Sequence, residues 1–201
     1  MQDLFSIKGK VALVTGGSRG IGEMIAAGFL AHGAKVYISS RKADVCDATA
    51  KRLMAQFGGE CISMPANLAE VDSIQAFAND LASRESQLDI LVNNAGVSWG
   101  ASLDDFPEVG WDKVMDTNVK GVFFLTQKLL PLLRTSGNAE DPARVINIGS
   151  VDGLKTPAFE TFSYGPSKAA VHHLTRVLAA HLTKEHIICN AIAPGPFPTW
   201  M

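Results

Sequence analysis

Short apolar runs alternate along this chain with longer segments in which apolar residues recur every three or four positions. The short runs predict strands at Lys10–Thr15, Ala34–Ser39, Glu60–Pro65, Asp89–Val92, Arg144–Ile148 and His186–Ile192. The intervening segments predict helices near Gly20–His32, Ala43–Phe57, Val71–Ser83, Trp111–Leu133 and Thr161–Lys184. Apolar strands joined through helices predict a parallel sheet covered on both faces, which is a doubly wound, Rossmann-like α/β fold. No linker interrupts the alternation, so residues 1–201 are expected to form a single domain.

Polar motifs follow several of the predicted strands directly. Asn67-Leu68 follows the third, Asn93-Asn94-Ala95-Gly96 the fourth, Gly149-Ser150 the fifth and Pro194-Gly195 the sixth. In doubly wound sheets, ligands bind beyond the carboxyl ends of the strands. We therefore expect these segments to converge on one ligand-binding cleft.

A glycine-rich string lies between the first strand and the first helix. Its spacing is G-x-x-x-G-x-G, unlike the G-x-G-x-x-G of the commonest dinucleotide fingerprint. Glycine permits backbone angles closed to other residues, and helix amides can bind a pyrophosphate. A packing role for the glycines is the alternative. The predicted cofactor contacts here are Gly16, Ser18, Arg19, Gly20, Ile21 and Gly22.

The end of the second strand indicates which dinucleotide is bound. Sites that prefer NAD place a carboxylate there for the ribose 2′-OH, whereas NADP sites need positive charge. This strand ends in Ser39-Ser40-Arg41-Lys42, without an acid. Ser40 and Arg41, with Arg19, are therefore predicted to bind the 2′-phosphate of NADPH or NADP+. The alternative is that these cations are merely solvated.

Tyr164 and Lys168 are candidates for proton transfer. Residues four apart share one face of a helix, which brings the ammonium near the phenol. Tyrosine ionises near pH ~10, and a shift of ~3 units toward neutrality corresponds to about 4 kcal/mol. We expect Lys168 and an oxidised nicotinamide to provide that lowering. Tyr164 would then exchange a proton with a carbonyl oxygen held by Ser150. Such a Tyr/Lys pair also arises often by chance.

Composition narrows the classes of partner. The chain has 201 residues, 47% of them hydrophobic, with 18 basic and 20 acidic side chains and a formal net charge of -2. This balance favours neither nucleic acid nor a membrane surface, and no apolar run is long enough for a membrane span. Cys46, Cys61 and Cys189 are scattered, which indicates reduced thiols in a cytoplasmic protein. His172-His173 lack a third ligand at suitable spacing, so no metal site is expected.

Taken in chain order, these segments resemble the short-chain dehydrogenase/reductase family over essentially the whole chain. The motifs that match are Thr15-Gly16-x-x-x-Gly20-x-Gly22, Asn93-Asn94-Ala95-Gly96, Asn118, Ser150, Tyr164-x-x-x-Lys168 and Pro194-Gly195. The resemblance implies that Tyr164 is the acid/base and that Lys168 lowers its pKa and holds the nicotinamide ribose. It further implies that Ser150 positions the carbonyl and that Asn118 supports a water relaying protons to Lys168. Without the resemblance, Asn118 would pass for an ordinary buried amide.

The same resemblance assigns the remaining cofactor contacts. It implies Asn67 and Leu68 beside the adenine, and Asn94, Ala95 and Gly96 beside the cofactor ribose. Pro194, Gly195 and Phe197 would lie beside the nicotinamide. Many family members have aspartate at the position of Asn67, but asparagine keeps an acceptor oxygen. The family is usually dimeric or tetrameric, so a homodimer or homotetramer is expected of a full-length chain.

Within the family, the sequence is most similar to bacterial 3-oxoacyl-(acyl-carrier-protein) reductases of the rhamnolipid-biosynthesis type. Trp99-Gly100-Ala101, the loop Asn138–Arg144, and the segments Val145–Ser150 and Tyr164–Ala170 carry that likeness. It implies an NADPH-dependent carbonyl reductase that acts on an acyl thioester, with acyl carrier protein as a candidate partner. Arg134, Arg176 and Lys184 could meet such an acidic partner, but isolated basic residues usually only solvate a helix face. The cleft would be bordered by Trp99, Phe159, Phe162 and Phe197, although aromatic residues more often pack in the core. Other small ketones, sugars and steroids are alternative substrates.

The family pattern continues beyond Thr199-Trp200-Met201 into a further helix and strand. We therefore expect this chain to lack the last unit of the fold, which would leave an edge strand exposed. That feature motivates a second hypothesis, in which the protein binds NADP(H) but is catalytically idle and acts as a redox sensor or scaffold.

Overall fold

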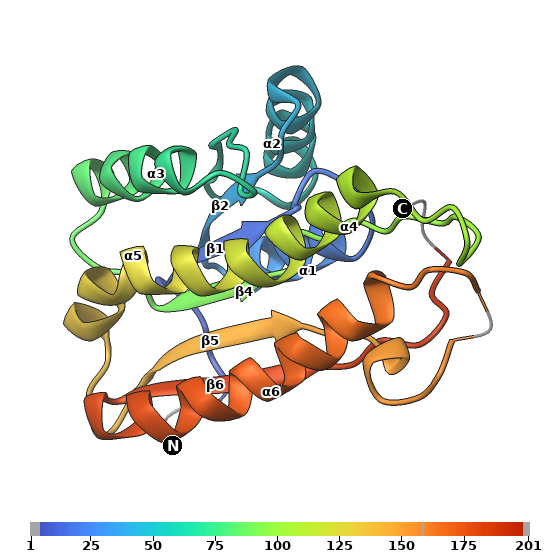
Figure 1. The fold of residues 1–201 in the computed structure, drawn as a ribbon. Coiled ribbons are helices and arrows are strands. Elements are labelled where there is room, and N and C mark those ends of the chain that lie inside the picture. The colour runs from blue at the N-terminus through green and yellow to red at the C-terminus, as the bar shows by residue number, and fades with distance from the viewer. Residues whose placement is uncertain (1–4, 158, 199–201) are drawn as a thin grey trace.

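The computed structural model describes residues 5–157 and 159–198, and a six-stranded parallel sheet lies at its centre (Figure 1). The strand order is β3-β2-β1-β4-β5-β6. The strands are β1 (Val11–Thr15), β2 (Lys35–Ser39), β3 (Cys61–Ser63), β4 (Ile90–Asn93), β5 (Ala143–Ile148) and β6 (Ile187–Ile192). The α-helices are α1 (Gly20–Ala31), α2 (Ala43–Phe57), α3 (Val71–Arg84), α4 (Glu108–Met115), α5 (Gly121–Ser136) and α6 (Tyr164–Leu182). The predicted doubly wound fold is confirmed.

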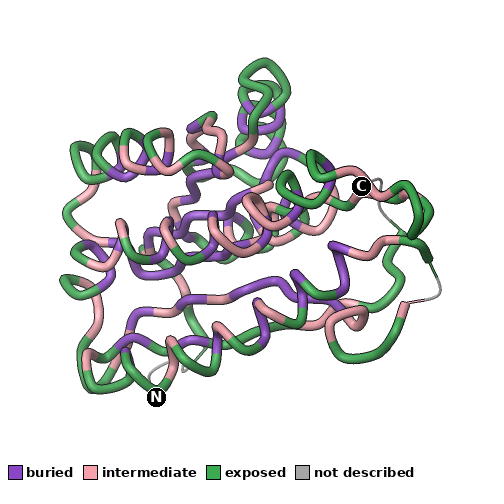
Figure 2. The backbone as a smooth tube through the Cα atoms, viewed as in Figure 1, coloured by how far each residue is buried: buried purple, intermediate pink, exposed green. Residues whose placement is uncertain are grey.

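Side chains along the buried strands alternate between the two faces of the sheet, and helices cover both faces. Successive side chains of a strand point to opposite faces. Leu13 belongs to a core shared with α3, α5 and α6, whereas its neighbour Val14 belongs to a second core shared with α1 and α2. Strands β1, β2, β4 and β5 are buried along most of their length, while the outer helix faces are exposed (Figure 2). Burial on both faces explains why the strands are continuously apolar.

The largest difference from the predicted elements lies in the segment Trp111–Leu133. In place of one helix, α4 and α5 are separated by a turn of π-helix at Asp116–Lys120. The N–H of Gly121 bonds to Asp116 O, five residues back. A Cβ on Gly121 would lie 2.3 Å from Leu68 O, so this close contact requires glycine. A pattern based on 3.6 residues per turn cannot detect one widened turn, and such turns often occur at functional sites.

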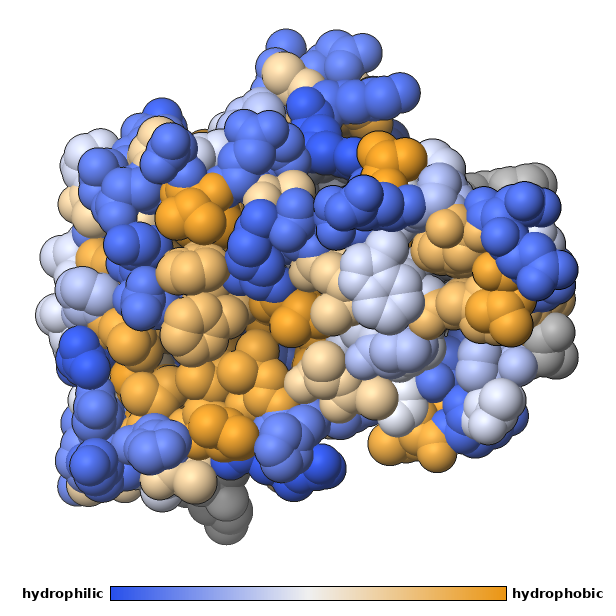
Figure 3. Space-filling view, in the orientation of Figure 1, coloured by the Kyte–Doolittle hydropathy of each residue, from blue (hydrophilic) through white to orange (hydrophobic). Residues whose placement is uncertain are grey.

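Several smaller features complete the fold. Strand β3 is shorter than predicted, and α6 begins at Tyr164 instead of Thr161. Strand β6 lies at a sheet edge, and Ile188 and Ile192 on it are 40% and 51% exposed. Apolar side chains also gather at the surface over α5 and α6 (Figure 3), where Phe123 and Val177 are exposed. Within the described ranges, no helix is both long and apolar enough to cross a membrane.

Candidate active site

The glycine string forms the turn between β1 and α1, as predicted. Gly16 and Gly20 have φ angles of 63° and 58°, in the left-handed region that favours glycine. A Cβ on Gly22 would lie 2.3 Å from Gly16 O and 2.4 Å from Asn94 Nδ2. Arg19 precedes α1, and no side chain caps this end of the helix. The first N–H groups of α1 are therefore available to an anion such as a pyrophosphate.

Thr15 and Asn94 join the glycine turn to the loop after β4. Thr15 Oγ1 accepts from the N–H groups of Asn94 and Ala95, at 2.9 and 3.0 Å, and donates to Val92 O. Asn94 Nδ2 donates to Thr15 O at 2.9 Å and to Gly16 O at 3.3 Å. The amide nitrogen of Asn94, predicted to lie beside the ribose, thus already bonds to the turn. Thr15, which was not among the predicted contacts, orders both loops.

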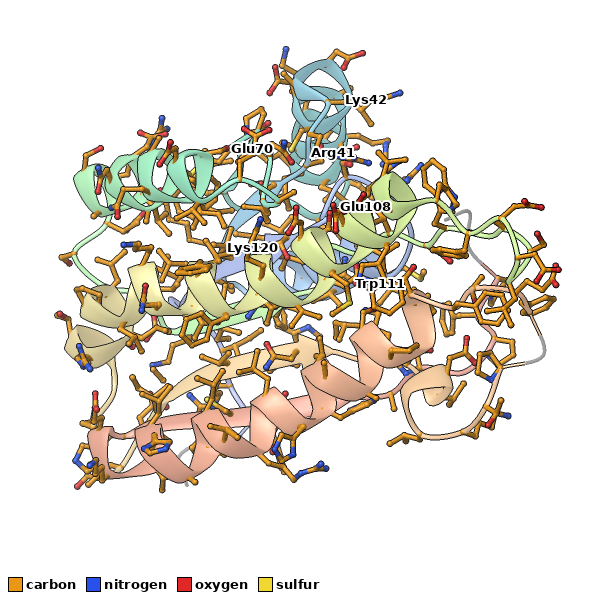
Figure 4. All side chains as sticks on the ribbon, in the orientation of Figure 1. Arg41, Lys42, Glu70, Glu108, Trp111 and Lys120 are labelled. Carbon is orange, nitrogen blue, oxygen red and sulfur yellow. The ribbon has the colours of Figure 1, made fainter. Side chains whose placement is uncertain are left out.

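The predicted 2′-phosphate site lies at the start of α2. Arg41 and Lys42 are exposed there, side by side (Figure 4), and Arg19 is exposed in the glycine turn. Among the described residues, neither Arg19 nor Arg41 has an ion-pair or hydrogen-bond partner for its guanidinium group. Ser40 Oγ donates to Lys42 O at 3.1 Å. Two unengaged guanidinium groups suit a phosphate better than the ribose hydroxyl of NAD.

The predicted adenine contacts lie in the loop after β3. Asn67 is half-buried; its Nδ2 donates to Glu70 Oε1 at 2.7 Å, and its Oδ1 accepts from Ala69 N. Leu68 is only 7% exposed and belongs mainly to the core. This loop is thus ordered by its own hydrogen bonds and by packing.

Asn118 lies at the centre of the π-helical turn and is fully buried. Its Oδ1 accepts from Val97 N, and its Nδ2 donates to Val97 O and to Ser167 Oγ, all at 2.9–3.0 Å. Ser167 Oγ donates in turn to Tyr164 O at 2.7 Å. The amide therefore connects the loop after β4 to the first turn of α6. Sequence patterns contain no signal that Ser167 and Val97 hydrogen-bond to Asn118.

Tyr164 begins α6 and Lys168 lies one turn further along it, with Ser150 just beyond β5. Lys168 Nζ lies 5.7 Å from the centre of the Tyr164 ring and donates to Ile148 O at 2.7 Å. Ser150 Oγ accepts from Asp152 N at 3.1 Å. A Cβ built on Gly96 would lie 3.4 Å from Lys168 Nζ and 3.5 Å from Asn118 Oδ1. The ammonium and the amide oxygen therefore border the same space above Gly96.

Burial controls the ionisation of this pair. It lowers the pKa of Lys168, which is 4% exposed, to about 8. Burial also raises the pKa of Tyr164; the Ser150 hydroxyl opposes that rise and Asp152 adds to it. In the protein without cofactor the pKa of Tyr164 is therefore raised, and the lowering expected from Lys168 together with an oxidised nicotinamide stays a prediction. The ammonium lies over the ring and bonds to Ile148 O, so desolvation dominates.

The segment after β6 runs beside Ser150. Gly149 N donates to Ile192 O at 2.7 Å, and Val151 N donates to Pro194 O at 3.1 Å, with Gly195 following. Phe197, predicted to lie near the nicotinamide, is 53% exposed. This arrangement brings Pro194 to the carboxyl end of β5, as the sequence predicted.

The four aromatic residues predicted to border the cleft differ in their exposure and in their neighbours. Phe162 packs edge-on against Phe106, with 5.9 Å between ring centres, and Phe159 is 77% exposed. Trp99 lies 5.0 Å from Lys113 Nζ and occupies the space where Gly110 lacks a side chain. Phe162 and Trp99 thus have packing partners, and that the four rings border one substrate cleft stays a prediction.

The histidine pair and the cysteines, to which the sequence assigned no catalytic or metal-binding role, lie in the following surroundings. His172 is buried against the backbone of Ser150, whereas His173 is exposed beside Arg176. No group of three metal-ligating side chains occurs in the part of the chain that the structure describes. All three cysteines are free and buried, and burial raises the pKa of Cys61 to about 12 and that of Cys189 to about 11.

Comparison with known proteins places this arrangement in a family. The chain is 54% identical over 201 residues to the rhamnolipids biosynthesis 3-oxoacyl-(acyl-carrier-protein) reductase of Pseudomonas aeruginosa, covering 100% of this chain and 78% of that protein. It is 36% identical over 209 residues to gluconate 5-dehydrogenase of Gluconobacter oxydans, covering 99% of this chain and 75% of that enzyme.

Solved structures agree with these sequence matches. The Pseudomonas aeruginosa RhlG/NADP active-site complex superposes with a TM-score of 0.95 at 54% identity, covering 99% of this chain and 77% of that one. L-Sorbose reductase from Gluconobacter frateurii, complexed with NADPH and L-sorbose, gives a TM-score of 0.90 at 29% identity, with 96% and 72% covered. Residues 10–201 match the family described as short chain dehydrogenase. On the fold, the arrangement of Ser150, Tyr164 and Lys168, and these matches, the chain belongs to the short-chain dehydrogenase/reductase family.

Proposed function

We propose that this protein is an NADPH-dependent carbonyl reductase that reduces a 3-oxoacyl thioester to the 3-hydroxyacyl product and catalyses the reverse alcohol oxidation. The observation that carries the proposal is the grouping of Tyr164, Lys168 and Ser150 at the carboxyl edge of β5, within the fold of an oxidoreductase family. The relatives named a 3-oxoacyl reductase and an NADP complex support the substrate and the cofactor.

The residues at the carboxyl edge of the sheet fit NADPH. The uncapped start of α1, the left-handed glycines and the two unengaged guanidinium groups suit a dinucleotide with an extra phosphate. When bound, NADPH supplies a hydride to the carbonyl carbon. Lys168 donates one hydrogen bond within the described residues, to Ile148 O, which leaves two N–H groups for ribose hydroxyls. The proposed contacts are those predicted from the sequence: Gly16, Ser18, Arg19, Gly20, Ile21, Gly22, Ser40, Arg41, Asn67, Leu68, Asn94, Ala95, Gly96, Tyr164, Lys168, Pro194, Gly195 and Phe197.

Ser150 and Tyr164 together act on the substrate oxygen in this proposal. Ser150 Oγ accepts from Asp152 N, and its O–H, which bonds to Tyr164 in the protein alone, would donate to the carbonyl oxygen when substrate is bound. That bond strengthens as negative charge develops on the oxygen. Tyr164 then gives its phenolic proton to the same oxygen. Its raised pKa keeps the phenol protonated near neutral pH, the form that reduction requires.

Lys168 and Asn118 restore the proton of Tyr164. One lone pair of Asn118 Oδ1 accepts from Val97 N, and the second faces the space that Lys168 Nζ also borders. A water in this space can bond to both groups and pass a proton toward Lys168. In the oxidation direction Tyr164 acts as the base, and its pKa must fall. The protein alone does not provide that change, so it requires positive charge added on binding.

The names of the relatives indicate which substrate and partner to propose. An acyl thioester, free or on acyl carrier protein, follows from the reductase relative. The sugar substrate of L-sorbose reductase marks the main alternative class. We also propose a homodimer or homotetramer. A cytoplasmic location is supported by three buried, free thiols.

The test is NADPH oxidation, followed by absorbance, with 3-oxoacyl thioesters of several chain lengths. Tyr164→Phe should lower kcat by ~100-fold or more, because it removes the general acid, while the Kd for NADPH changes little. Tyr37→Phe is the matched control, since that hydroxyl bonds to Glu85 and should affect stability only.

Two outcomes would contradict this function. Retained turnover in Tyr164→Phe would exclude the phenol as the acid. NADPH binding without turnover on thioesters, ketones or sugars would favour the idle, cofactor-sensing alternative.

A further inference from the structure

One buried histidine close to the proposed catalytic residues has no part in the mechanism so far. His172 lies one helical turn beyond Lys168 on α6 and is only 9% exposed. Its Nε2 lies 3.1 Å from Ser150 O and 3.5 Å from Ser150 N. A Cβ on Gly149 would fall 2.3 Å from Cε1 and 2.6 Å from Nε2 of the imidazole. The ring therefore fills the space that a side chain at position 149 would need.

The distances assign the hydrogen bond. One ring nitrogen cannot donate to the carbonyl and accept from the N–H of Ser150 at the same time. The shorter distance assigns Nε2–H as the donor to Ser150 O. Lys168 and His172 lie four residues apart on one helix face, and Lys168 donates to Ile148 O at 2.7 Å. Successive turns of α6 thus hold the carbonyls on either side of Gly149.

Ser150 O accepts two hydrogen bonds, one from Gly153 N at 3.0 Å within the following turn and one from His172. The N–H groups of Gly149 and Val151 bond to the segment around the end of β6, so His172 is the side chain that contacts both backbone polar groups of Ser150. Ser150 Oγ accepts the Asp152 N–H, and the same side chain hydrogen-bonds to Tyr164. The position of Oγ is set by these contacts and by how the backbone of Ser150 is held.

We propose that His172 is a positioning residue: its Nε2–H holds Ser150 O and thereby places the Ser150 hydroxyl for the substrate carbonyl. This inference rests on the proposed function, because it takes Ser150 to act on that oxygen. The adjacent His173 has no such contact; it is exposed, with Nδ1 3.2 Å from Arg176 Nη2.

Four variants of the full chain test the proposal: His172→Leu, His172→Gln, His172→Asn and His173→Leu. Leucine removes the donor and should lower kcat about 10- to 100-fold, since small misplacements of a reacting group have effects of this size. The glutamine amide nitrogen substitutes for Nε2 and should restore kcat to within roughly threefold, whereas the shorter asparagine should not. The Kd for NADPH should not change, and His173→Leu should behave as the unaltered protein.

Combination with Ser150→Ala separates positioning from a general structural role. If His172 acts through Ser150, His172→Leu should lower kcat by less than about twofold further in the Ser150→Ala background. A full additional loss there would overturn the proposal. If the leucine variant does not fold, equal kcat values for the glutamine and asparagine variants would overturn it. Full activity of Ser150→Ala itself would instead contradict the proposed function.

Discussion

Lys168→Met should make the protein more stable at neutral pH while removing its activity. Lys168 is 4% exposed, and burial lowers its pKa from 10.5 to about 8. At about 1.4 kcal/mol per pKa unit, keeping this amine charged in the folded state costs roughly 3 kcal/mol of stability. Methionine also loses the hydrogen bond from the charged amine to Ile148 O, a net loss of about 1.5–3 kcal/mol. The free energy of unfolding should therefore rise by at most roughly 1.5 kcal/mol at pH 7.

The pH dependence gives the sharper test. Between the folded pKa, about 8, and the unfolded value, 10.5, the folded state binds fewer protons than the unfolded state. The contribution of Lys168 to stability therefore increases with pH across this window. The stability of the methionine variant relative to the unaltered protein should fall by about 2 kcal/mol between pH 7 and pH 9.5. Buried Cys61 and Cys189 have raised pKa values, so their contributions decline above pH 9, but equally in both proteins.

The measurement is denaturant unfolding of both proteins at a series of pH values. Lys35→Met is the matched control: Lys35 pairs with Glu85 and Glu60, which raise its pKa, so this variant should lose stability at pH 7. A stability difference between Lys168→Met and the unaltered protein that does not change with pH would refute the argument from burial. Lower stability of Lys168→Met at pH 7 would show that the lost hydrogen bond outweighs desolvation.

Three further predictions concern residues near the carboxyl edge of the sheet, where the cofactor is proposed to bind. Gly22→Ala should lower stability by about 1–3 kcal/mol and abolish NADPH binding, because the added Cβ would overlap the glycine turn. In the control Gly28→Ala, in the same helix, the added Cβ meets no atom within 4 Å, so this variant should be neutral or stabilising in the same unfolding assay. Thr15→Val leaves two N–H groups of the loop after β4 without their acceptor, so it should cost about 1–3 kcal/mol for each that stays buried, and unchanged stability would contradict that role. Arg41→Ala should weaken NADPH binding at least about tenfold with little effect on NADH, as a lost charge-assisted phosphate contact predicts; an equal loss for both nucleotides, or the same loss in the distant control Arg84→Ala, would contradict it.

The sequence alone determined the features that depend on near neighbours along the chain. Strand and helix periodicity, the glycine turn, and the four-residue spacing that brings Lys168 to Tyr164 all follow from local backbone geometry. Because parallel strands end at one edge of the sheet, chain order also located the site there.

Only the tertiary structure decided the contacts between distant segments. The π-helical turn at Asn118, the bonds of Asn94 to the glycine turn and the contact of His172 with Ser150 join residues that local patterns cannot relate. The rise in the pKa of Tyr164 has the same origin, since desolvation depends on all atoms packed around a group. Periodicity reports which face of an element is buried, whereas packing decides what each buried group meets.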